Sequence, residues 1–176
     1  MQSSFFTFTA YSVQALNAYA PKSAASVVAA RVARAKNWLM TAKAQTSEDR
    51  SSQLLGLKWA GASAKDRQTV VKTILKDQRA DGGWAQVPNM PSDAYATGQA
   101  LYALRVGGGM SVKDPVYMKG TRFLLLTQDE DGSWFTNKRA IPANNYFDSS
   151  FPHGESQYAS FNATCWATLA LLPTAK

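Results

Sequence analysis

Apolar residues recur at the 3.6-residue spacing of an α-helix along most of the chain, and Gly and Pro residues interrupt this pattern. The pattern predicts an all-α fold. In the second predicted helix the apolar positions are four, three and four residues apart, as in an amphipathic helix. We expect seven helices, at about residues 5–19, 24–44, 48–60, 64–77, 93–106, 115–127 and 158–173, with a long loop over residues 135–158.

Polar residues at the predicted helix starts support these bounds. Ser63 and Asp66, three residues apart, resemble a capping box at the start of the fourth helix. Asp114 followed by Pro115 is typical of the N-cap and first turn of a helix. Ser47 is the expected N-cap of the third helix.

Charged residues divide the helices into two kinds. The second, fourth and sixth helices carry many Lys and Arg residues, whereas the first, fifth and seventh contain only Arg105 before the terminal Lys176. A helix with almost no charge is most easily buried against its neighbours. We therefore expect two layers, with the odd-numbered helices inside and the even-numbered helices outside.

A short motif occurs twice after an apolar helix. Gln78 and Trp84 are six residues apart, as are Gln128 and Trp134, and a Gly lies two residues before each Trp. The Gln amide is suited to bonding free backbone groups at a helix end, and the Trp ring to packing against the next element. A third, degenerate copy begins at residues 34–39, with Lys43 in the position of the Gln. Repetition at roughly 35 to 50 residues indicates stacked supersecondary units.

These residues resemble the QW motif of the squalene-hopene cyclase, oxidosqualene cyclase and prenyltransferase superfamily. The resemblance extends to the helices that contain Tyr95-Ala96-Thr97-Gly98 and Phe161-Asn162-Ala163-Thr164-Cys165-Trp166-Ala167. It implies an α/α toroid, in which two concentric rings of helices surround an apolar cavity. The residues that carry the QW resemblance, and for which it implies a structural role, are Gln78, Gly82, Trp84, Lys119, Gly120, Phe123, Gln128, Gly132 and Trp134.

The resemblance implies that residues 1–176 are a single toroid domain similar to the C-terminal part of a squalene cyclase. A closed toroid of six helix pairs needs about twelve helices, so seven helices form only part of a ring. We therefore expect either a longer protein with an N-terminal half or closure by self-association. A run of 18 apolar residues, which a membrane-spanning helix needs, does not occur.

The implied function is that of a squalene or terpenoid cyclase-like domain that lines an isoprenoid-binding cavity, an isomerase if an upstream half completes it. Cyclases of this kind protonate an alkene or epoxide with an Asp from a DxDD motif. The carboxyl group of that Asp must itself be held protonated. The sequence contains no DxDD motif, and Asp93 and Glu155 are the remaining acid candidates. Both are also explained as residues at a helix start. The alternative function is a non-catalytic toroid that binds a hydrophobic ligand or a protein partner.

Aromatic residues on the predicted inner helices suit an apolar cavity, where ring faces can stabilise carbocations, although core packing would also explain each of them. The residues that we expect to line the cavity are Tyr95, Tyr102, Phe161, Cys165 and Trp166. We expect the loops over residues 86–92 and 135–158 to border its mouth.

The prenyltransferase branch of the superfamily implies a zinc site made by an Asp, a Cys and a His. Here the single His153 precedes the single Cys165 by 12 residues, which is the reverse of that family's order. We therefore expect no metal and no cofactor, with Cys165 a small buried residue on the inner face. The net charge of +7 lies mainly on the outer helices. A basic outer surface favours an anionic membrane surface as a partner. We expect no nucleic-acid partner, because the sequence contains no known nucleic-acid-binding module.

Overall fold

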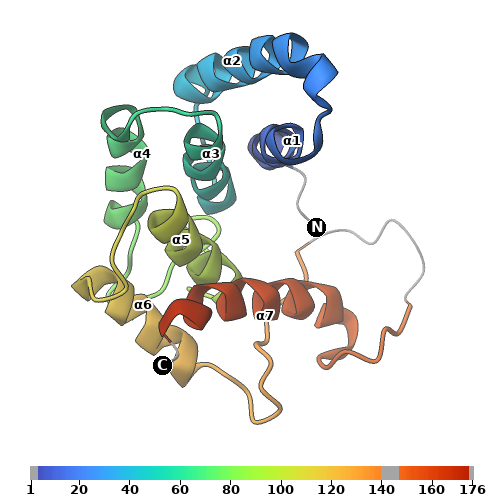
Figure 1. Cartoon of the computed structure of the whole chain (residues 1–176). Helices are drawn as coiled ribbons and strands as arrows, with labels where there is room; N and C mark the ends of the chain where they lie inside the picture. The colour runs from blue at the N-terminus through green and yellow to red at the C-terminus, as the bar shows by residue number, and fades with distance from the viewer. Residues whose placement is uncertain (1–3, 140–146, 175–176) are drawn as a thin grey trace. The chain divides into compact units, whose positions relative to one another are not determined.

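The computed structural model describes residues 4–139 and 147–174 (Figure 1). Within these residues the chain forms seven α-helices and no β-strand, which confirms the predicted fold class and is consistent with part of an α/α toroid. Short 3-10 turns precede α2 and flank α7. The helices are α1 (Phe5–Tyr19), α2 (Ala25–Thr41), α3 (Ser47–Trp59), α4 (Ala64–Lys76), α5 (Ala94–Val106), α6 (Pro115–Leu126) and α7 (Gln157–Leu171).

The helix starts follow the capping residues of the sequence, with one correction. The Ser63 and Asp66 capping box opens α4, and the Asp114 carboxylate accepts from the Val116 amide at 2.8 Å to cap α6. Helix α3 is capped by Thr46 and not by Ser47. Asp49 lies three residues after Thr46, so that these two residues can complete a reciprocal capping box, at 3.0 and 3.1 Å.

The described residues form two compact units. The N-terminal unit contains residues 4–77 and 103–110, and therefore α1 to α4 and the end of α5. The C-terminal unit contains residues 78–102, 111–139 and 147–174, and therefore most of α5 with α6 and α7.

In the N-terminal unit, α3 is the central helix. It contacts α1, α2 and α4, and nine of its 13 residues are buried. Figure 1 shows α3 between α1 and α4, with α2 running across α1 and α3. Helices α1 and α3 approach closely because Gly56 has no side chain, and a Cβ there would lie 3.0 Å from the Cβ of Ala10. Within this unit α1 and α3 therefore lie directly against each other, α2 contacts both of them, and α4 contacts α3.

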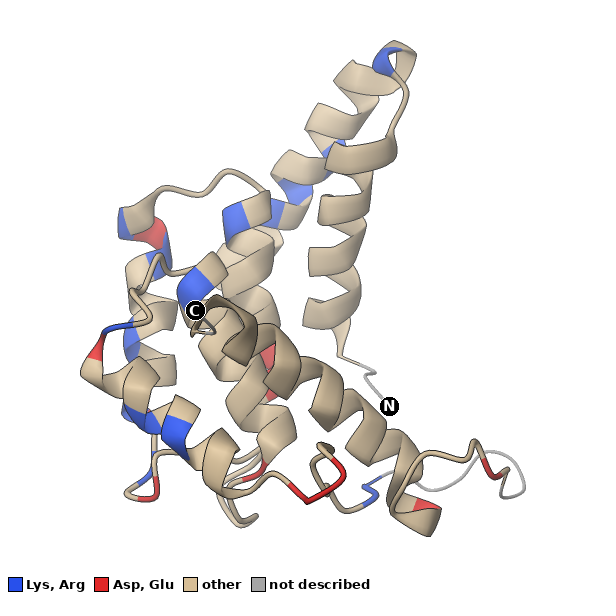
Figure 2. Cartoon of the chain, turned by 60° about the horizontal axis from the view of Figure 1, so that its bottom comes forward, with Lys and Arg blue, Asp and Glu red and all other residues tan. Residues whose placement is uncertain are grey.

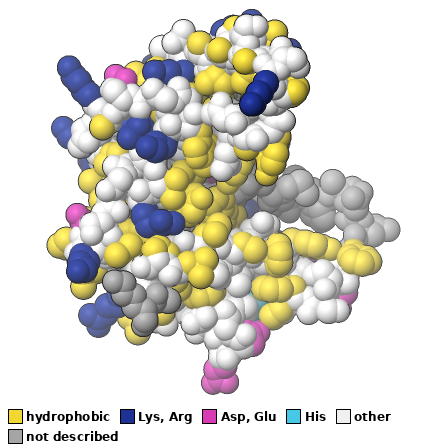
Figure 3. All heavy atoms as spheres, viewed as in Figure 1, with side chains coloured by type: hydrophobic (Ala, Val, Ile, Leu, Met, Phe, Trp, Pro, Cys, Tyr) yellow, Lys and Arg dark blue, Asp and Glu magenta, His cyan; other side chains and the backbone are white. Residues whose placement is uncertain are grey.

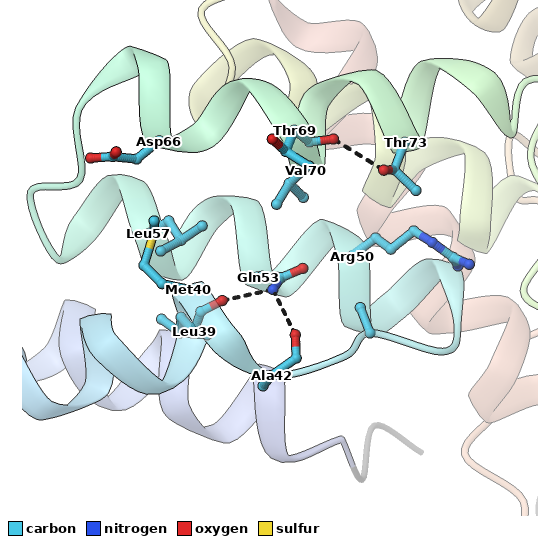
Figure 4. Close-up of a pocket in the computed structure, with 11 residues that line it drawn as sticks. Leu39, Met40, Ala42, Arg50, Gln53, Leu57, Asp66, Thr69, Val70 and Thr73 are labelled. Carbon is cyan, nitrogen blue, oxygen red and sulfur yellow. Dashed lines mark hydrogen bonds between the residues drawn. The ribbon is translucent and has the colours of Figure 1, made fainter.

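Polar contacts also hold the N-terminal unit together. The buried hydroxyl of Thr7 on α1 donates to the Glu48 carboxylate on α3 at 2.9 Å. The amide of Gln53 donates to the carbonyls of Leu39 and Ala42 at 2.7 and 3.2 Å (Figure 4). The last carbonyls of a helix have no partner within the helix. Gln53 therefore joins the end of α2 to the central helix.

In the C-terminal unit, α5 packs closely on both α6 and α7. A Cβ at Gly98 of α5 would lie 2.5 Å from the carbonyl carbon of Trp166, and one at Gly120 of α6 would lie 2.8 Å from Leu101. The buried Tyr117 donates its hydroxyl to the carbonyl of Ala170 at 2.7 Å. Gly98 therefore lets α5 approach the backbone of α7, and Gly120 leaves room for the Leu101 side chain.

Only one side of α6 is buried, which corrects the broad apolar stripe suggested by its sequence. Tyr117, Gly120 and Leu124 are buried, at spacings of three and four residues. Leu125 and Leu126 are 58% and 72% exposed because each residue advances about 100° around the helix and turns away from that side.

The two copies of the Gln to Trp motif form the same turn, and we call them the first and second Gln-Trp turns (residues 78–84 and 128–134). In each turn the Gln amide donates to the carbonyl of the Gly at 2.9 Å. The Gly has a positive φ, 90° in the first turn and 84° in the second. The buried Trp donates its backbone N–H to a Thr hydroxyl of the next helix, Thr97 at 2.9 Å in the first turn and Thr164 at 3.1 Å in the second.

The turns differ in what lies against them. In the first turn the amide of Gln78 also donates to the carbonyl of Val116 in the first turn of α6, at 2.9 Å. A Cβ at Gly82 would lie 2.6 Å from the carbonyl oxygen of Lys119, whereas a Cβ at Gly132 would approach only the Gln128 amide, at 3.8 Å. The first turn is therefore docked on a helix, and the second turn lacks such a helix within the described residues.

We predict that Gly82→Ala destabilises the protein more than Gly132→Ala. Both substitutions place a side chain at positive φ, which costs about 1–2 kcal/mol. Gly82→Ala also forces a clash with the backbone of α6, which adds about 1–3 kcal/mol. Urea denaturation of both variants measures the difference. Equal losses of unfolding free energy would contradict the docked arrangement of the first turn.

We also predict that Asp49 makes the stability of the protein dependent on acid pH. Burial raises the pKa of Asp49, but hydrogen bonds from Ser4 and from the backbone amides of Thr46 and Gln45 outweigh it and hold the pKa below its usual value of 3.8. A carboxylate with a lowered folded-state pKa stabilises the fold above pH 3.8, and this contribution is lost as the pH falls further.

The variant Asp49→Asn, compared with wild type by denaturant unfolding from neutral to acid pH, tests this dependence. The advantage of the wild type should be constant above pH 3.8 and should shrink below it. Asp49→Ala should lose about 1 kcal/mol at neutral pH, as is typical for a capping residue. Parallel pH profiles for Asp49→Asn and wild type would show that Asp49 has no such role.

Candidate functional site

Helix α7 exposes its large apolar residues and buries mostly small ones. We call the exposed set the α7 face. Its members are spaced by three, four, four and three residues and so share one side of the helix, and they are Tyr158, Phe161, Cys165, Leu169 and Leu172. The rest of the helix buries the small residues Ser160, Ala163, Ala167 and Ala170, together with Gln157 and Trp166. Apart from Trp166, this reverses the usual arrangement, in which the larger apolar residues face the core.

The α7 face carries no charge. Helix α7 contains no Asp, Glu, Lys or Arg (Figure 2), and Figure 3 shows hydrophobic side chains gathered along it. Phe161 is 51% exposed and Leu172 is 61% exposed. Contiguous apolar surface of this kind marks a site for a ligand, a membrane or another protein, whereas isolated exposed apolar residues need no explanation.

Aromatic residues of the preceding loop extend the α7 face. The ring of Phe151 lies 5.4 Å from that of Phe161, edge to face, and 6.4 Å from the imidazole of His153. The ring of Phe135 lies 5.4 Å from the same imidazole. Edge-to-face contacts at these distances are favourable beyond their buried area. The apolar surface therefore continues from α7 onto residues 135 and 151–153.

His153 ties this loop to the second Gln-Trp turn. Its Nε2 lies 2.9 Å from the Ser133 hydroxyl and 3.7 Å from the Asp129 carboxylate. Its φ of 84° is rare for a residue other than Gly, and such conformations persist where several contacts hold the residue in place. Both Ser133 and Asp129 approach the same ring nitrogen, whereas a Ser-His-Asp triad uses one nitrogen for each partner. The contacts hold the loop and do not activate a nucleophile.

The five residues expected to line a cavity fall into two groups. Phe161 and Cys165 lie on the α7 face. Tyr95 and Trp166 are buried, and the rings of Tyr102 and Trp166 are 5.6 Å apart, edge to face, so that these three residues pack between helices. The expectation that Cys165 is buried is wrong, because it lies on the side of α7 that no described helix covers.

A pocket of about 390 Å³ lies beside the start of α5. It is bordered by residues 90–94 and 134–139, by Phe123 of α6 and by Thr127, which follows α6. Parts of both loops that were expected to border a cavity mouth, residues 86–92 and 135–158, therefore meet at one pocket.

Asp93 lies in this pocket with both of its carboxylate oxygens engaged. One oxygen accepts from the Ala96 amide at 2.9 Å and caps α5, and the other pairs with Arg139. The Arg139 guanidinium also lies 5.9 Å from the centre of the Tyr95 ring, within cation–π range. Both carboxylate oxygens are therefore used in contacts within the protein. This environment favours helix capping over proton donation.

Glu155, the other acid candidate, is exposed and pairs with Lys138. The hydrogen bond and the positive charge of Lys138 lower the pKa of Glu155 below its usual value. An acid that protonates an alkene needs the opposite change, a pKa raised by burial. The environment of Glu155 is therefore the opposite of the one that such an acid needs.

A second pocket, of about 330 Å³, lies in the N-terminal unit between α2, α3 and α4 (Figure 4). Its polar side chains already have structural partners. Arg50 pairs with Asp77 at 3.4 Å, Gln53 binds the end of α2, and Asp66 belongs to the capping box of α4. These three polar side chains of the pocket are therefore already engaged in contacts that hold the helices.

The described residues contain no group of three His, Cys, Asp or Glu side chains arranged to hold a metal ion. His153 contacts Ser133, and Cys165 lies on the α7 face. Among residues 4–139 and 147–174, none of the helices is both long and apolar enough to span a bilayer.

Sequence reasoning missed several residues of the apolar surface. Tyr158 and Leu169 have the same helical spacing as Phe161 and Cys165, so that counting along one side of the predicted helix would have found them. Phe135 and Phe151 lie in irregular segments, where no periodicity relates them to α7. Their place beside the α7 face depends on the contacts of His153.

Comparison with protein families gives one match. Residues 21–129, more than half of the chain, match the family model described as the squalene-hopene cyclase N-terminal domain. The match is to the N-terminal domain and not to the C-terminal part that the sequence resemblance suggested. It ends within the second Gln-Trp turn, so α7 lies outside it. A comparison with curated proteins finds no match.

We predict that Asp93→Ala lowers the free energy of unfolding by about 1 kcal/mol, because α5 loses its N-cap. Asp93→Asn should cost less, since an Asn side chain caps a helix almost as well as Asp. Thermal or urea unfolding of the two variants tests this order. If Asp93→Asn were as destabilising as Asp93→Ala, the pairing with Arg139 and not capping would be the main contribution of Asp93.

Proposed function

Because the chain belongs to the squalene-hopene cyclase N-terminal domain family, we propose that it acts as a terpenoid cyclase-like domain that binds a hydrophobic isoprenoid. In this proposal the α7 face forms part of the wall of the binding site. The ligand is an uncharged, flexible hydrocarbon chain, for which an uncharged aromatic and aliphatic wall is the complementary surface.

The reversed burial of α7 is the observation that carries the proposal. The helix packs on α5 through small residues and Trp166, and with the turn that follows it leaves two aromatic rings and two Leu side chains exposed. Covering this surface would stabilise a complex by about 25 cal/mol for each Å² of apolar area removed from water. The faces of Tyr158 and Phe161 would also attract a carbocation by about 0.5–2 kcal/mol each, depending on how fully water is excluded.

In a catalytic complex this chain would supply residues of the binding-site wall. Another segment would supply the acid. Asp93 and Glu155 are both paired with cations, and the sequence has no DxDD motif. The proposed isomerase activity therefore requires an acid from outside residues 1–176. The QW motif roles assigned to the two Gln-Trp turns are structural in this proposal, since the turns connect successive helices.

The pairing of Asp93 and Glu155 also supports a second candidate function. A toroid domain without an available acid can bind a hydrophobic ligand, or a protein that presents an apolar surface, without reaction. The two candidates share the α7 face and differ in whether a bound polyene is converted.

We predict that Phe161→Ala weakens binding of farnesol, a soluble isoprenoid alcohol, by about tenfold. Loss of one buried aromatic contact of about 1.4 kcal/mol gives this factor. Displacement of a fluorescent apolar dye measures the affinity. Leu126→Ala is the matched control, because Leu126 is 72% exposed on α6 and lies outside the α7 face. Equal effects of the two substitutions, or no binding by wild type, would contradict the proposal.

Incubation of the protein with squalene, followed by product analysis, separates the two candidates. Binding without a cyclised product supports the non-catalytic role or the need for an acid from another segment. A cyclised product would show that this chain contains its own acid, and Asp93→Asn would then test the better placed candidate.

A further inference from the structure

The first Gln-Trp turn shows how such a turn binds a helix. Gln78 donates to the carbonyl of Val116, and Gly82 lies against the backbone of Lys119. Gly83 lies against the ring of Phe123, whose nearest atoms would be 3.1 Å from an added Cβ. The turn therefore occupies one face of α6, made by residues 116, 119 and 123, which follow one another at spacings of three and four.

The second Gln-Trp turn has the same internal geometry without such a helix. It keeps the Gln to Gly hydrogen bond, the positive φ at Gly132 and the Asp131 side chain that accepts from the Ser133 amide at 2.9 Å. Gln128 is exposed, and the described residues place no second carbonyl beside its amide. His153 contacts Ser133 and Asp129 of this turn, and among the described residues Gly132 has no neighbour closer than the Gln128 amide. Gln128 and Gly132 are therefore preformed for contact with a helix like α6, so binding would cost little ordering entropy.

Helix α2 has an exposed face that matches the docked face of α6. Residues 34–39 of α2 correspond to residues 119–124 of α6 in the repeated motif, and Leu39 and Leu124, which end these segments, are both fully buried. The two helices are therefore in the same rotational register. In this register Arg31, Arg34 and Trp38 take the places of residues 116, 119 and 123. Arg31 and Arg34 are exposed, and Trp38 is 39% exposed with its ring 4.8 Å from that of Phe6 on α1.

The charges of the second turn and of α2 are complementary. Asp129, Glu130 and Asp131 are consecutive and exposed in the turn. Helix α2 contains Arg31, Arg34 and Lys36 and no acidic residue. The first turn carries Arg79, Ala80 and Asp81 at the corresponding positions and is already docked on α6. The acidic turn is therefore suited to a basic helix, and α2 is a basic helix with the matching face exposed.

We infer that the second Gln-Trp turn of one copy of this chain docks on α2 of a second copy. The Gln128 amide donates to the carbonyl of residue 31, Gly132 lies against the backbone of Arg34, and Glu130 faces Arg31 and Arg34. The contact joins two different surfaces and is a head-to-tail association. It is independent of whether the α7 face binds an isoprenoid.

Sedimentation velocity over a range of protein concentrations tests the contact. Wild type should self-associate at low salt and dissociate as ionic strength rises, because exposed charge pairs are screened. Glu130→Arg and Arg34→Glu should each weaken association by about tenfold or more, since each creates like charges across the contact. Lys72→Glu, which makes the same charge change as Arg34→Glu at an exposed position of α4, is the control and should associate like wild type.

Mixing the two single variants gives the decisive result. A Glu130→Arg copy retains a wild-type α2, and an Arg34→Glu copy retains a wild-type turn, so both kinds of contact in the mixture pair opposite charges. The mixture should associate while each variant alone does not. A monomeric wild type at every concentration, association that the turn and α2 variants leave unchanged, or a mixture that stays monomeric would overturn the inference. Equal loss in Lys72→Glu would point to overall charge and overturn it as well.

Discussion

The hydrogen bond from each buried Trp backbone amide to a Thr hydroxyl is the contact on which the helical arrangement depends. It follows a turn closed by a Gln amide and a Gly with positive φ, and it joins that turn to a Thr inside the next helix of the opposite kind. A buried amide without this acceptor would lose its hydrogen bond to water and gain nothing in return. The Thr therefore holds α5 or α7 against the turn.

Packing within the C-terminal unit follows from this placement. Once α5 and α7 are held at their Thr residues, Gly98 allows the backbone of α7 to approach α5. Most of the other buried residues of α7 are Ser and Ala, and Trp166 packs against Tyr102 of α5. Small residues at a helix contact give a short distance between axes and leave little space for large side chains between them. Apart from Trp166, the large apolar side chains of α7 lie on its other side. The exposed apolar surface is thus a consequence of how α7 is packed.

The acidic residues show how environment decides the role of a carboxyl group. Asp93 has backbone and guanidinium partners, and Glu155 has an ammonium partner. Asp49 is partly buried, yet the hydrogen bonds from Ser4, Thr46 and Gln45 lower its pKa. Each of these carboxylates stabilises a helix start or a loop. Proton donation to an alkene requires burial without such partners, and neither of the two acid candidates has that combination.

The sequence by itself determined the number of helices, most of their starts and the duplicated turn, because these depend on local spacing, capping residues and Gly. It also indicated the superfamily, through residues such as Gln128 and Trp134 that lie close together in the chain. Only the tertiary structure decided which side of α7 is exposed, that Cys165 is on that side, and that Arg139 pairs with Asp93 across 46 residues of sequence. These features depend on contacts between distant segments, and helical periodicity shows that a side chain belongs to one face without showing what will cover it.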